Sequence, residues 1–178
     1  MIKIAMKPSG NIQLHELSET DLEIAGNPYS ISVLKVGYCV SEPDGSFRAD
    51  GTITLLTGPK TVLVDTGGPW DREFLLARLK EKGFESGDID VVVGTHGHSD
   101  HIGNLGLFPG ALVVVGCDIS QGDRYLPNQL SEGQRYPVDE YVSSRDGTTS
   151  VTQVEVQILM FNKIIFLSTC EKSELFFK

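Results

Sequence analysis

One buried strand that ends directly in a loop of histidines constrains this chain more than any other feature. Residues 89–95 read IDVVVGT, and a continuous run of β-branched residues is typical of a strand buried on both faces of a sheet. The next six residues, 96–101, read HGHSDH and hold three of the four histidines in the chain. Loops at the ends of core strands hold side chains rigidly and still reach solvent. The position therefore favours a functional site.

The sequence around this strand predicts a layered α/β fold. A helix is expected over residues 69–83, where Pro69 suits the first helical position and Gly83 a C-terminal stop, with Trp70, Phe74, Leu75 and Leu79 lining one face. A second, short helix is expected within 101–108. Strands are expected at 31–40, 52–58, 61–67, 89–95 and 111–116, with a hairpin turn at 58–60. Strands that alternate with helices are typical of a parallel sheet covered by helices.

Charge and cysteine content exclude several classes of protein. The chain has 178 residues and a formal net charge of −9, from 15 Lys and Arg against 24 Asp and Glu. This balance excludes the broad basic surface that binds nucleic acid without specificity or anionic membranes. The three cysteines are odd in number and widely spaced, which argues against a disulfide framework. With no apolar stretch long enough for a membrane span, we expect a cytosolic protein without a membrane partner.

The spacing within the histidine loop predicts a metal site. Residues two apart point the same way in an extended segment, so His96 and His98 can present both imidazoles to one cation. Asp100 and His101, where the chain turns toward a helix, can face a second cation. Imidazole and carboxylate groups suit Zn²⁺ and similar first-row metals. The alternative is a set of surface or helix-capping histidines. We accept that alternative for the isolated His15 but not for the cluster.

Asp65 ends another apolar strand, in the segment VLVDTGG. It is either a turn residue or a carboxylate that orients metal ligands from behind them, and the sequence favours both about equally.

Two segments carry a resemblance to a known family. THGHSDH at 95–101, preceded by VDTG at 64–67, resembles the metallo-β-lactamase superfamily of metal-dependent hydrolases. Longer segments at 64–70, 92–111 and 124–127 narrow the resemblance to one subfamily. We accordingly divide the chain into an irregular N-terminal segment at 1–26, a partial metallo-β-lactamase-like domain at 27–141 and a divergent tail at 142–178.

The resemblance implies an αββα sandwich with two zinc ions on one rim of its sheets. His96 and His98 would bind the first zinc and Asp100 and His101 the second, with Asp65 as a conformational support. Asp100 would also hold a zinc-activated water in line for attack. The similar subfamily member is described as an endoribonuclease acting on histone pre-mRNA 3′ ends, which implies an RNA substrate and a cytosolic or nuclear location. Thioester hydrolysis of the glyoxalase II type is the alternative, and the acidic charge favours it.

The second half of the chain departs from the family pattern. The family takes further ligands from a TPGH-like loop, a bridging aspartate and a last histidine, but no histidine follows His101 here. Residues 142–178, in which Val154, Val156, Ile158 and Met160 alternate like a strand, are interpreted as a splice end or truncated gene product. That replacement predicts exposed apolar surface on the strands at 89–95 and 111–116, which favours aggregation or a homodimer. A third hypothesis follows, an impaired isoform that binds metal weakly or pairs with a full-length partner.

Overall fold

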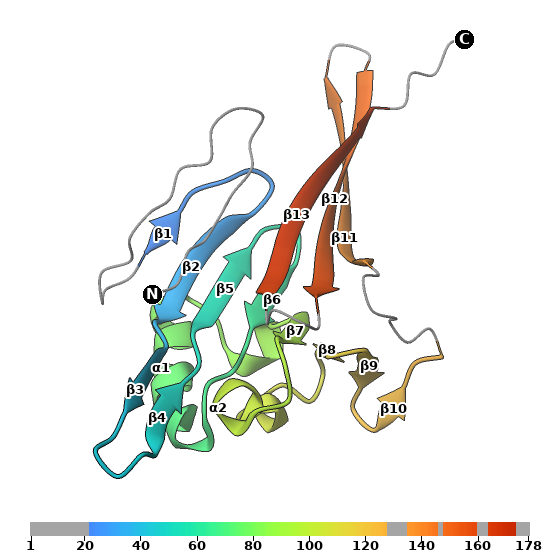
Figure 1. The fold of residues 1–178 in the computed structure, drawn as a ribbon. Coiled ribbons are helices and arrows are strands. Elements are labelled where there is room, and N and C mark those ends of the chain that lie inside the picture. The colour runs from blue at the N-terminus through green and yellow to red at the C-terminus, as the bar shows by residue number, and fades with distance from the viewer. Residues whose placement is uncertain (1–21, 128–134, 146–147, 160–163, 174–178) are drawn as a thin grey trace.

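A mixed sheet forms the centre of the computed structural model, which describes residues 22–127, 135–145, 148–159 and 164–173 (Figure 1). In the described residues the sheet has eight strands in the order β1-β2-β5-β6-β7-β8-β9-β10. The central strands β6, β7 and β8 are parallel, and the strands on either side pair antiparallel. Their bounds are β1 Glu23–Ile24, β2 Ser30–Lys35, β5 Ile53–Thr57, β6 Thr61–Val64, β7 Val91–Gly94, β8 Leu112–Val115, β9 Asp118–Gln121 and β10 Arg124–Tyr125.

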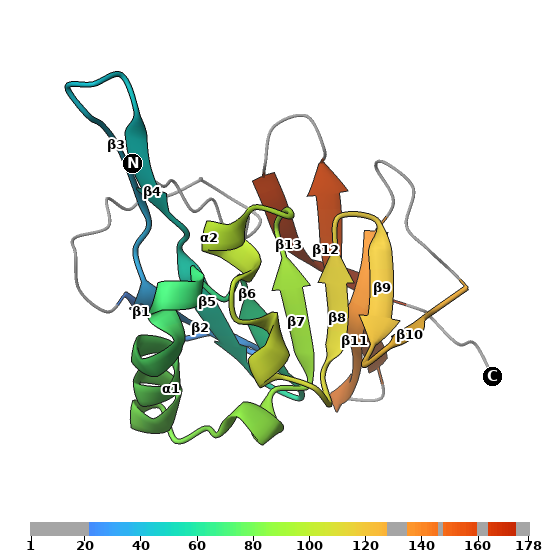
Figure 2. The ribbon, with the colours of Figure 1, turned by 90° about the horizontal axis from the view of Figure 1, so that it is seen from below.

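Helical segments connect the parallel strands, so the predicted α/β order is confirmed. Between β6 and β7 lie η1 Pro69–Asp71, α1 Arg72–Glu81 and η2 Ser86–Asp88; between β7 and β8 lie α2 Ser99–Ile102 and η3 Leu105–Leu107. Figure 2 looks onto the face of the sheet that carries both α1 and α2. In the part of the chain that the structure describes, no helix is long and apolar enough to cross a bilayer.

Apolar side chains fill both faces of the large sheet. Alternation along the strands sends Leu63 and Val92 toward the cluster that contains Leu75 and Leu79 of α1. Their neighbours in β6, β7 and β8 join a second cluster, which includes Val62, Val91, Val93 and Val114. The valines of β7 and Val114 of β8 are all buried. The expectation that the strands at 89–95 and 111–116 leave apolar surface exposed is therefore wrong for these residues.

Three long strands beyond residue 134 form a separate antiparallel sheet. They are β11 Arg135–Arg145, β12 Thr148–Leu159 and β13 Ile164–Ser173, in that spatial order. Figures 1 and 2 place this sheet on the face of the large sheet away from α1 and α2. Val154, Val156 and Ile158 lie in β12 as predicted, whereas Met160 and residues 1–21 lie outside the described residues. The boundary placed between 141 and 142 falls inside β11, and the division into three parts stays a prediction.

The predicted strand at 31–40 is two strands. The first part is β2, and the second, β3 Tyr38–Ser41, pairs with β4 Phe47–Asp50 as a separate two-stranded ribbon. Gly37 lies at the break, where a Cβ atom would stand 2.4 Å from the carbonyl oxygen of Asp50.

The predicted helix and hairpin differ from the structure only in detail. The turn at 58–60 joins β5 and β6 as expected, and Gly83 follows α1 with a φ of +85°. Of the four side chains expected to line one helix face, Leu75 and Leu79 are buried, whereas Trp70 and Phe74 are exposed. The predicted face is wrong for those two. Trp70 lies in the 3₁₀ helix η1, outside the periodicity of the α-helix, and Phe74 lies in the first turn of α1.

Candidate metal site

The histidine loop and Asp65 meet because two neighbouring parallel strands end together. Val64 of β6 stands opposite Val93 of β7, so the residues after each strand emerge at the same edge of the sheet. The backbone N–H of Asp65 donates to the carbonyl of Val93 at 2.8 Å. The structure therefore brings Asp65 beside the loop that carries His96 and His98.

Four side chains of this loop lie close to one another. The ring centroids of His96 and His98 are 4.5 Å apart, and those of His96 and His101 are 4.1 Å apart. His98 precedes α2, whose first turn contains Asp100 and His101. Oδ2 of Asp100 lies 3.5 Å from Nε2 of His101. The loop thus gathers three imidazoles and one carboxylate.

Asp65 is buried and holds the loop through three hydrogen bonds. Its side chain is 4% exposed, and its φ of +59° is a left-handed conformation that aspartate tolerates at a turn. Oδ1 accepts from the backbone N–H of Thr95 at 2.7 Å, and Oδ2 accepts from the Thr95 hydroxyl at 2.8 Å. Oδ2 also lies 2.7 Å from Nδ1 of His101. A donor at Nδ1 leaves Nε2 as the ring nitrogen that can bind a cation.

Thr95 connects three of these groups and was not assigned a role from the sequence. Its hydroxyl oxygen lies 3.0 Å from Nδ1 of His96 and 3.2 Å from Nδ1 of His101, besides donating to Asp65. The sequence feature that could have indicated a role for Thr95 is its position directly between the end of β7 and His96.

A buried asparagine supports the loop from behind and had no signal in the sequence. The Asn104 side chain donates to the carbonyls of Thr66 at 2.9 Å and Gly68 at 2.6 Å. Thr66 in turn donates its backbone N–H to the carbonyl of His101 at 2.6 Å. These contacts tie the segment after β6 to the end of α2.

The donor set fits zinc in its chemistry. Imidazole nitrogen and carboxylate oxygen are ordinary zinc ligands, and Nε2 of His96 is shielded from solvent. Within the described ranges, no three His, Cys, Asp or Glu side chains are grouped closely enough to hold one metal ion. Catalytic zinc normally keeps three protein ligands.

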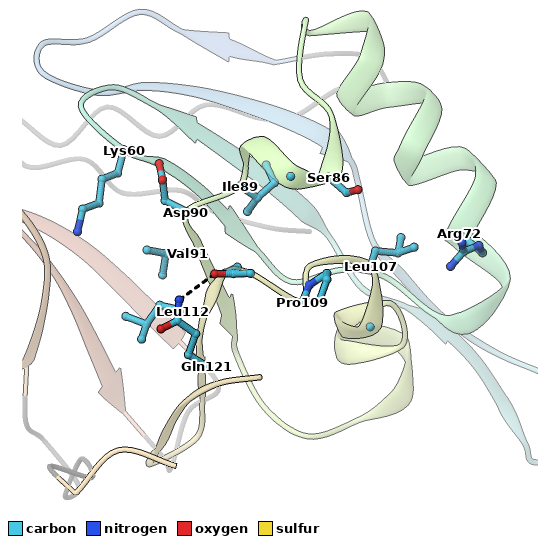
Figure 3. Close-up of a pocket in the computed structure, with 14 residues that line it drawn as sticks. Lys60, Arg72, Ser86, Ile89, Asp90, Val91, Leu107, Pro109, Leu112 and Gln121 are labelled. Atoms are coloured by element: carbon cyan, nitrogen blue, oxygen red, sulfur yellow. Dashed lines mark hydrogen bonds between the residues drawn. The ribbon is translucent and has the colours of Figure 1, made fainter. Parts of the chain in front are cut away.

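A hollow lies at the other end of the same strands. Its volume is about 640 Å³, and Lys60, Asp90 and Ala111, which each precede one of the parallel strands, help to line it (Figure 3). The histidine loop follows β7 whereas Asp90 precedes it, so the length of the strands separates the hollow from the loop. The residues that line the hollow include no histidine.

Comparisons with known proteins match the chain to one family. Residues 48–160 match the metallo-beta-lactamase superfamily. The chain is similar to metallo-beta-lactamase domain-containing protein 1 of Homo sapiens, at 46% identity over 144 residues, which covers 64% of this chain and 53% of the relative. The protein of that name from Xenopus laevis is 38% identical over 136 residues, covering 76% of this chain and 58% of the relative. The chain thus spans about half the length of these curated relatives.

Among solved structures, a subclass B3 metallo-beta-lactamase of Bradyrhizobium japonicum is 18% identical at a TM-score of 0.46. The match covers 70% of this chain and 53% of that chain.

Proposed function

Since the chain belongs to the metallo-beta-lactamase superfamily, we propose that it is a zinc-dependent hydrolase with its metal ligands in the histidine loop. The proposed ligands are His96 and His98 for one zinc and Asp100 and His101 for a second. The observation that carries this proposal is the cluster of imidazole rings, with centroid distances of 4.1 and 4.5 Å around His96. Buried Asp65 supports it further, because a metal-binding histidine commonly donates its other ring N–H to a carboxylate.

The chain's own residues would bind the metal and orient the reacting groups. Zinc, when bound, lowers the pKa of a coordinated water toward about 7 and polarises the bond to be cleaved. Asp65 positions His101 through Nδ1 and does not itself reach solvent. The Asp100 carboxylate, in contrast, is partly exposed and offers an oxygen that accepts a hydrogen bond from the attacking water.

For the substrate, we propose an RNA phosphodiester. The support is the subfamily resemblance of the segments around Asp65 and the histidine loop. A thioester is the second candidate, and the formal charge of −9 favours it, because RNA affinity usually comes from Lys and Arg. The proposed location is the cytosol or the nucleus. The free thiols of Cys39 and Cys117 support a reducing compartment.

A chain that binds metal weakly is one further candidate. Because no three donors are grouped for one ion in the described residues, the chain fits a weak metal binder that pairs with a longer partner. Its activity would then lie far below that of a family member with a full ligand set.

Zinc content and hydrolysis test these alternatives. We expect the purified chain to bind zinc, His98→Ala to lose most of it, and His15→Ala to retain it, because only His98 lies in the motif. Equal zinc in all three proteins would contradict the metal assignment. Chelator-sensitive cleavage of RNA, of a thioester or of neither then distinguishes the three candidates.

A further inference from the structure

A partly buried charged cluster lies beside the histidine loop and takes no part in the proposed chemistry. Nζ of Lys35, at the end of β2, forms ion pairs with Asp50 at the end of β4 and with Oδ1 of Asp71 in η1, the latter at 2.5 Å. The three side chains are 15%, 5% and 10% exposed, respectively. The indole N–H of Trp70 also donates to Oδ2 of Asp50, at 3.1 Å.

The cluster is held together by charge. Burial alone would raise the pKa of Asp50, but hydrogen bonds from Lys35 and Trp70 outweigh it and hold that pKa below the ordinary 3.8. Buried ion pairs are weak contributors to stability, since desolvation offsets their attraction, and some are retained because they specify one conformation. Here the cluster is linked to the histidine loop by two sets of hydrogen bonds, one through Asp50 and one through Asp71.

The first connection runs through Asp50 to the backbone of Asp100. The N–H of Gly51 donates to Oδ1 of Asp50 at 3.0 Å and to the carbonyl of Asp100 at 3.1 Å. A Cβ atom on Gly51 would stand 2.4 Å from that carbonyl oxygen and 3.1 Å from Nδ1 of His101. The backbone at residue 51 therefore rests directly on the loop.

The second connection runs through Asp71 to the residues just after His101. Oδ2 of Asp71 accepts from the N–H of Gly68 at 2.8 Å. The carbonyl of Gly67 accepts from the N–H of Gly103 at 2.9 Å, and the carbonyl of Gly68 accepts from the Asn104 side chain. The segment at 67–68 thus holds the end of the loop at Gly103 and Asn104.

We propose that Lys35 is a positioning residue for metal binding. By pairing with Asp50 and Asp71 together, it fixes two backbone segments, 50–51 and 67–68, whose hydrogen bonds hold residues 100–104 in place. Asp100 and His101 are thereby kept in one orientation. The metal-binding part of this inference rests on the proposed function, whereas the ordering of the loop does not.

Zinc affinity measures the first consequence. Lys35→Met should weaken zinc binding roughly 3–10-fold in a competition titration, less than the about 10–100-fold typical of groups that contact the ligands directly. Lys35→Arg keeps a cation that can pair with both carboxylates and should hold affinity to within about twofold of the unaltered chain. Lys82→Met is the matched control, because Lys82 pairs with Glu23 in β1 and has no described contact with the histidine loop. It should bind zinc like the unaltered chain.

Amide hydrogen exchange measures the second consequence without zinc. Lys35→Met should reduce the protection of the amides of Gly51, Thr66 and Gly103, which donate to Asp100, His101 and Gly67, and Lys82→Met should not. Asp71→Asn provides a second variant if Lys35→Met folds poorly, since the amide oxygen can still accept from Gly68 while the charge is lost. Leu79→Ala, in the core beneath α1, should lower thermal stability about as much as Lys35→Met without removing a residue of the charged cluster. It therefore controls for the effect of a general loss of stability.

The outcomes separate this inference from the proposed function. If the unaltered chain binds no zinc, the proposed metal site fails, and the exchange data alone decide whether Lys35 orders the loop. If the chain binds zinc and both Lys35→Met and Asp71→Asn keep its affinity within twofold, the inference is overturned. It is also overturned if Leu79→Ala, at an equal loss of stability, weakens zinc binding or amide protection to the same extent.

Discussion

At the scale of single residues, Asp65 is the side chain through which the sheet holds His101. It is buried at the end of β6 and bonds both Thr95 and the Nδ1 atom of His101. Asp65→Asn keeps an oxygen acceptor and tolerates the φ of +59°, since asparagine adopts the left-handed region more readily than most residues. It removes the negative charge beside Nδ1. We expect zinc affinity to fall about 10–100-fold in a chelator competition, with an unchanged circular dichroism spectrum.

An aspartate in a similar local role serves as the control for this change. Asp88 accepts from the backbone N–H of Glu85 at 2.7 Å, in the exposed turn before β7. Asp88→Asn should leave zinc affinity as it is. An Asp65→Asn chain that binds zinc as tightly as Asp88→Asn would remove Asp65 from the site.

The residues of the loop and their support Asp65 could be predicted from the sequence, whereas the other supporting residues, Thr95, Asn104 and Lys35, could not. The proposed ligands lie within six consecutive residues, and this clustering predicts a metal site. They are His96, His98, Asp100 and His101. Asn104 and Thr66 are 38 positions apart and Lys35 and Asp71 are 36 apart, and each pair meets only because β2, β6 and β7 lie in one sheet. A polar residue has no local pattern that names a partner so distant in sequence.

At the scale of elements, the packing of α2 against the segment after β6 depends on Gly103. Its φ of −61° suits any residue, so only the space around it argues for glycine. A Cβ atom there would lie 2.4 Å from the backbone nitrogen of Pro69 and 2.6 Å from the carbonyl carbon of Gly68. Gly103→Ala should therefore separate α2 from η1 and lower the free energy of unfolding by about 1–3 kcal/mol in urea titrations.

Gly87 in η2 offers the matched substitution. A Cβ atom at Gly87 would meet nothing within 4 Å, so Gly87→Ala should change the unfolding free energy by no more than about 0.5 kcal/mol. Equal urea midpoints for the two variants would show that the backbone around Gly103 yields without cost.

Elements could be predicted where the local pattern and the tertiary packing agree. The run of valines in β7 and the turn between β5 and β6 satisfy both. The strand expected at 31–40 fails at Gly37 because the chain there passes within contact of the Asp50 backbone, a residue of another strand. The alternation of apolar residues predicts which side chains can be buried. It does not predict where contact with a neighbouring strand ends a strand.

The pH dependence of unfolding tests the ion cluster between β2, β4 and η1. Because the folded pKa of Asp50 lies below its ordinary value of 3.8, its contribution to stability is present above that value and is lost as the pH falls through the folded pKa. We expect Asp50→Asn to be less stable than the unaltered chain at neutral pH, and the difference to narrow below about pH 4. Thermal unfolding at several pH values measures this, and parallel profiles for the two proteins would contradict it.

At the scale of the whole molecule, the large apolar side chains that are exposed in the described part of the chain lie outside the central strands β6, β7 and β8. Both faces of β7 are buried, whereas the ribbon β3–β4 extends beyond the large sheet (Figure 1). Val40 is 53% exposed and Phe47 is 70% exposed, and the pairing of Val40 with Arg48 and of Ser41 with Phe47 puts the two on opposite faces of the ribbon. An isolated two-stranded ribbon has unpaired edges as well, which is a recognised route to association between chains.

This ribbon gives the expected homodimer a different surface from the one that the sequence indicated. We expect the chain to self-associate at micromolar concentration through β3 and β4, because a second copy that covers either face of the ribbon buries Val40 on one face or Phe47 on the other and removes apolar area from water. The double substitution Val40→Ser with Phe47→Ser should shift the chain toward monomer in sedimentation velocity. Tyr125→Ser is the control, since Tyr125 is 68% exposed but lies in β10, at the other edge of the large sheet. A chain that is monomeric throughout this range, or a Tyr125→Ser variant that dissociates as readily as the double variant, would exclude the ribbon as the contact.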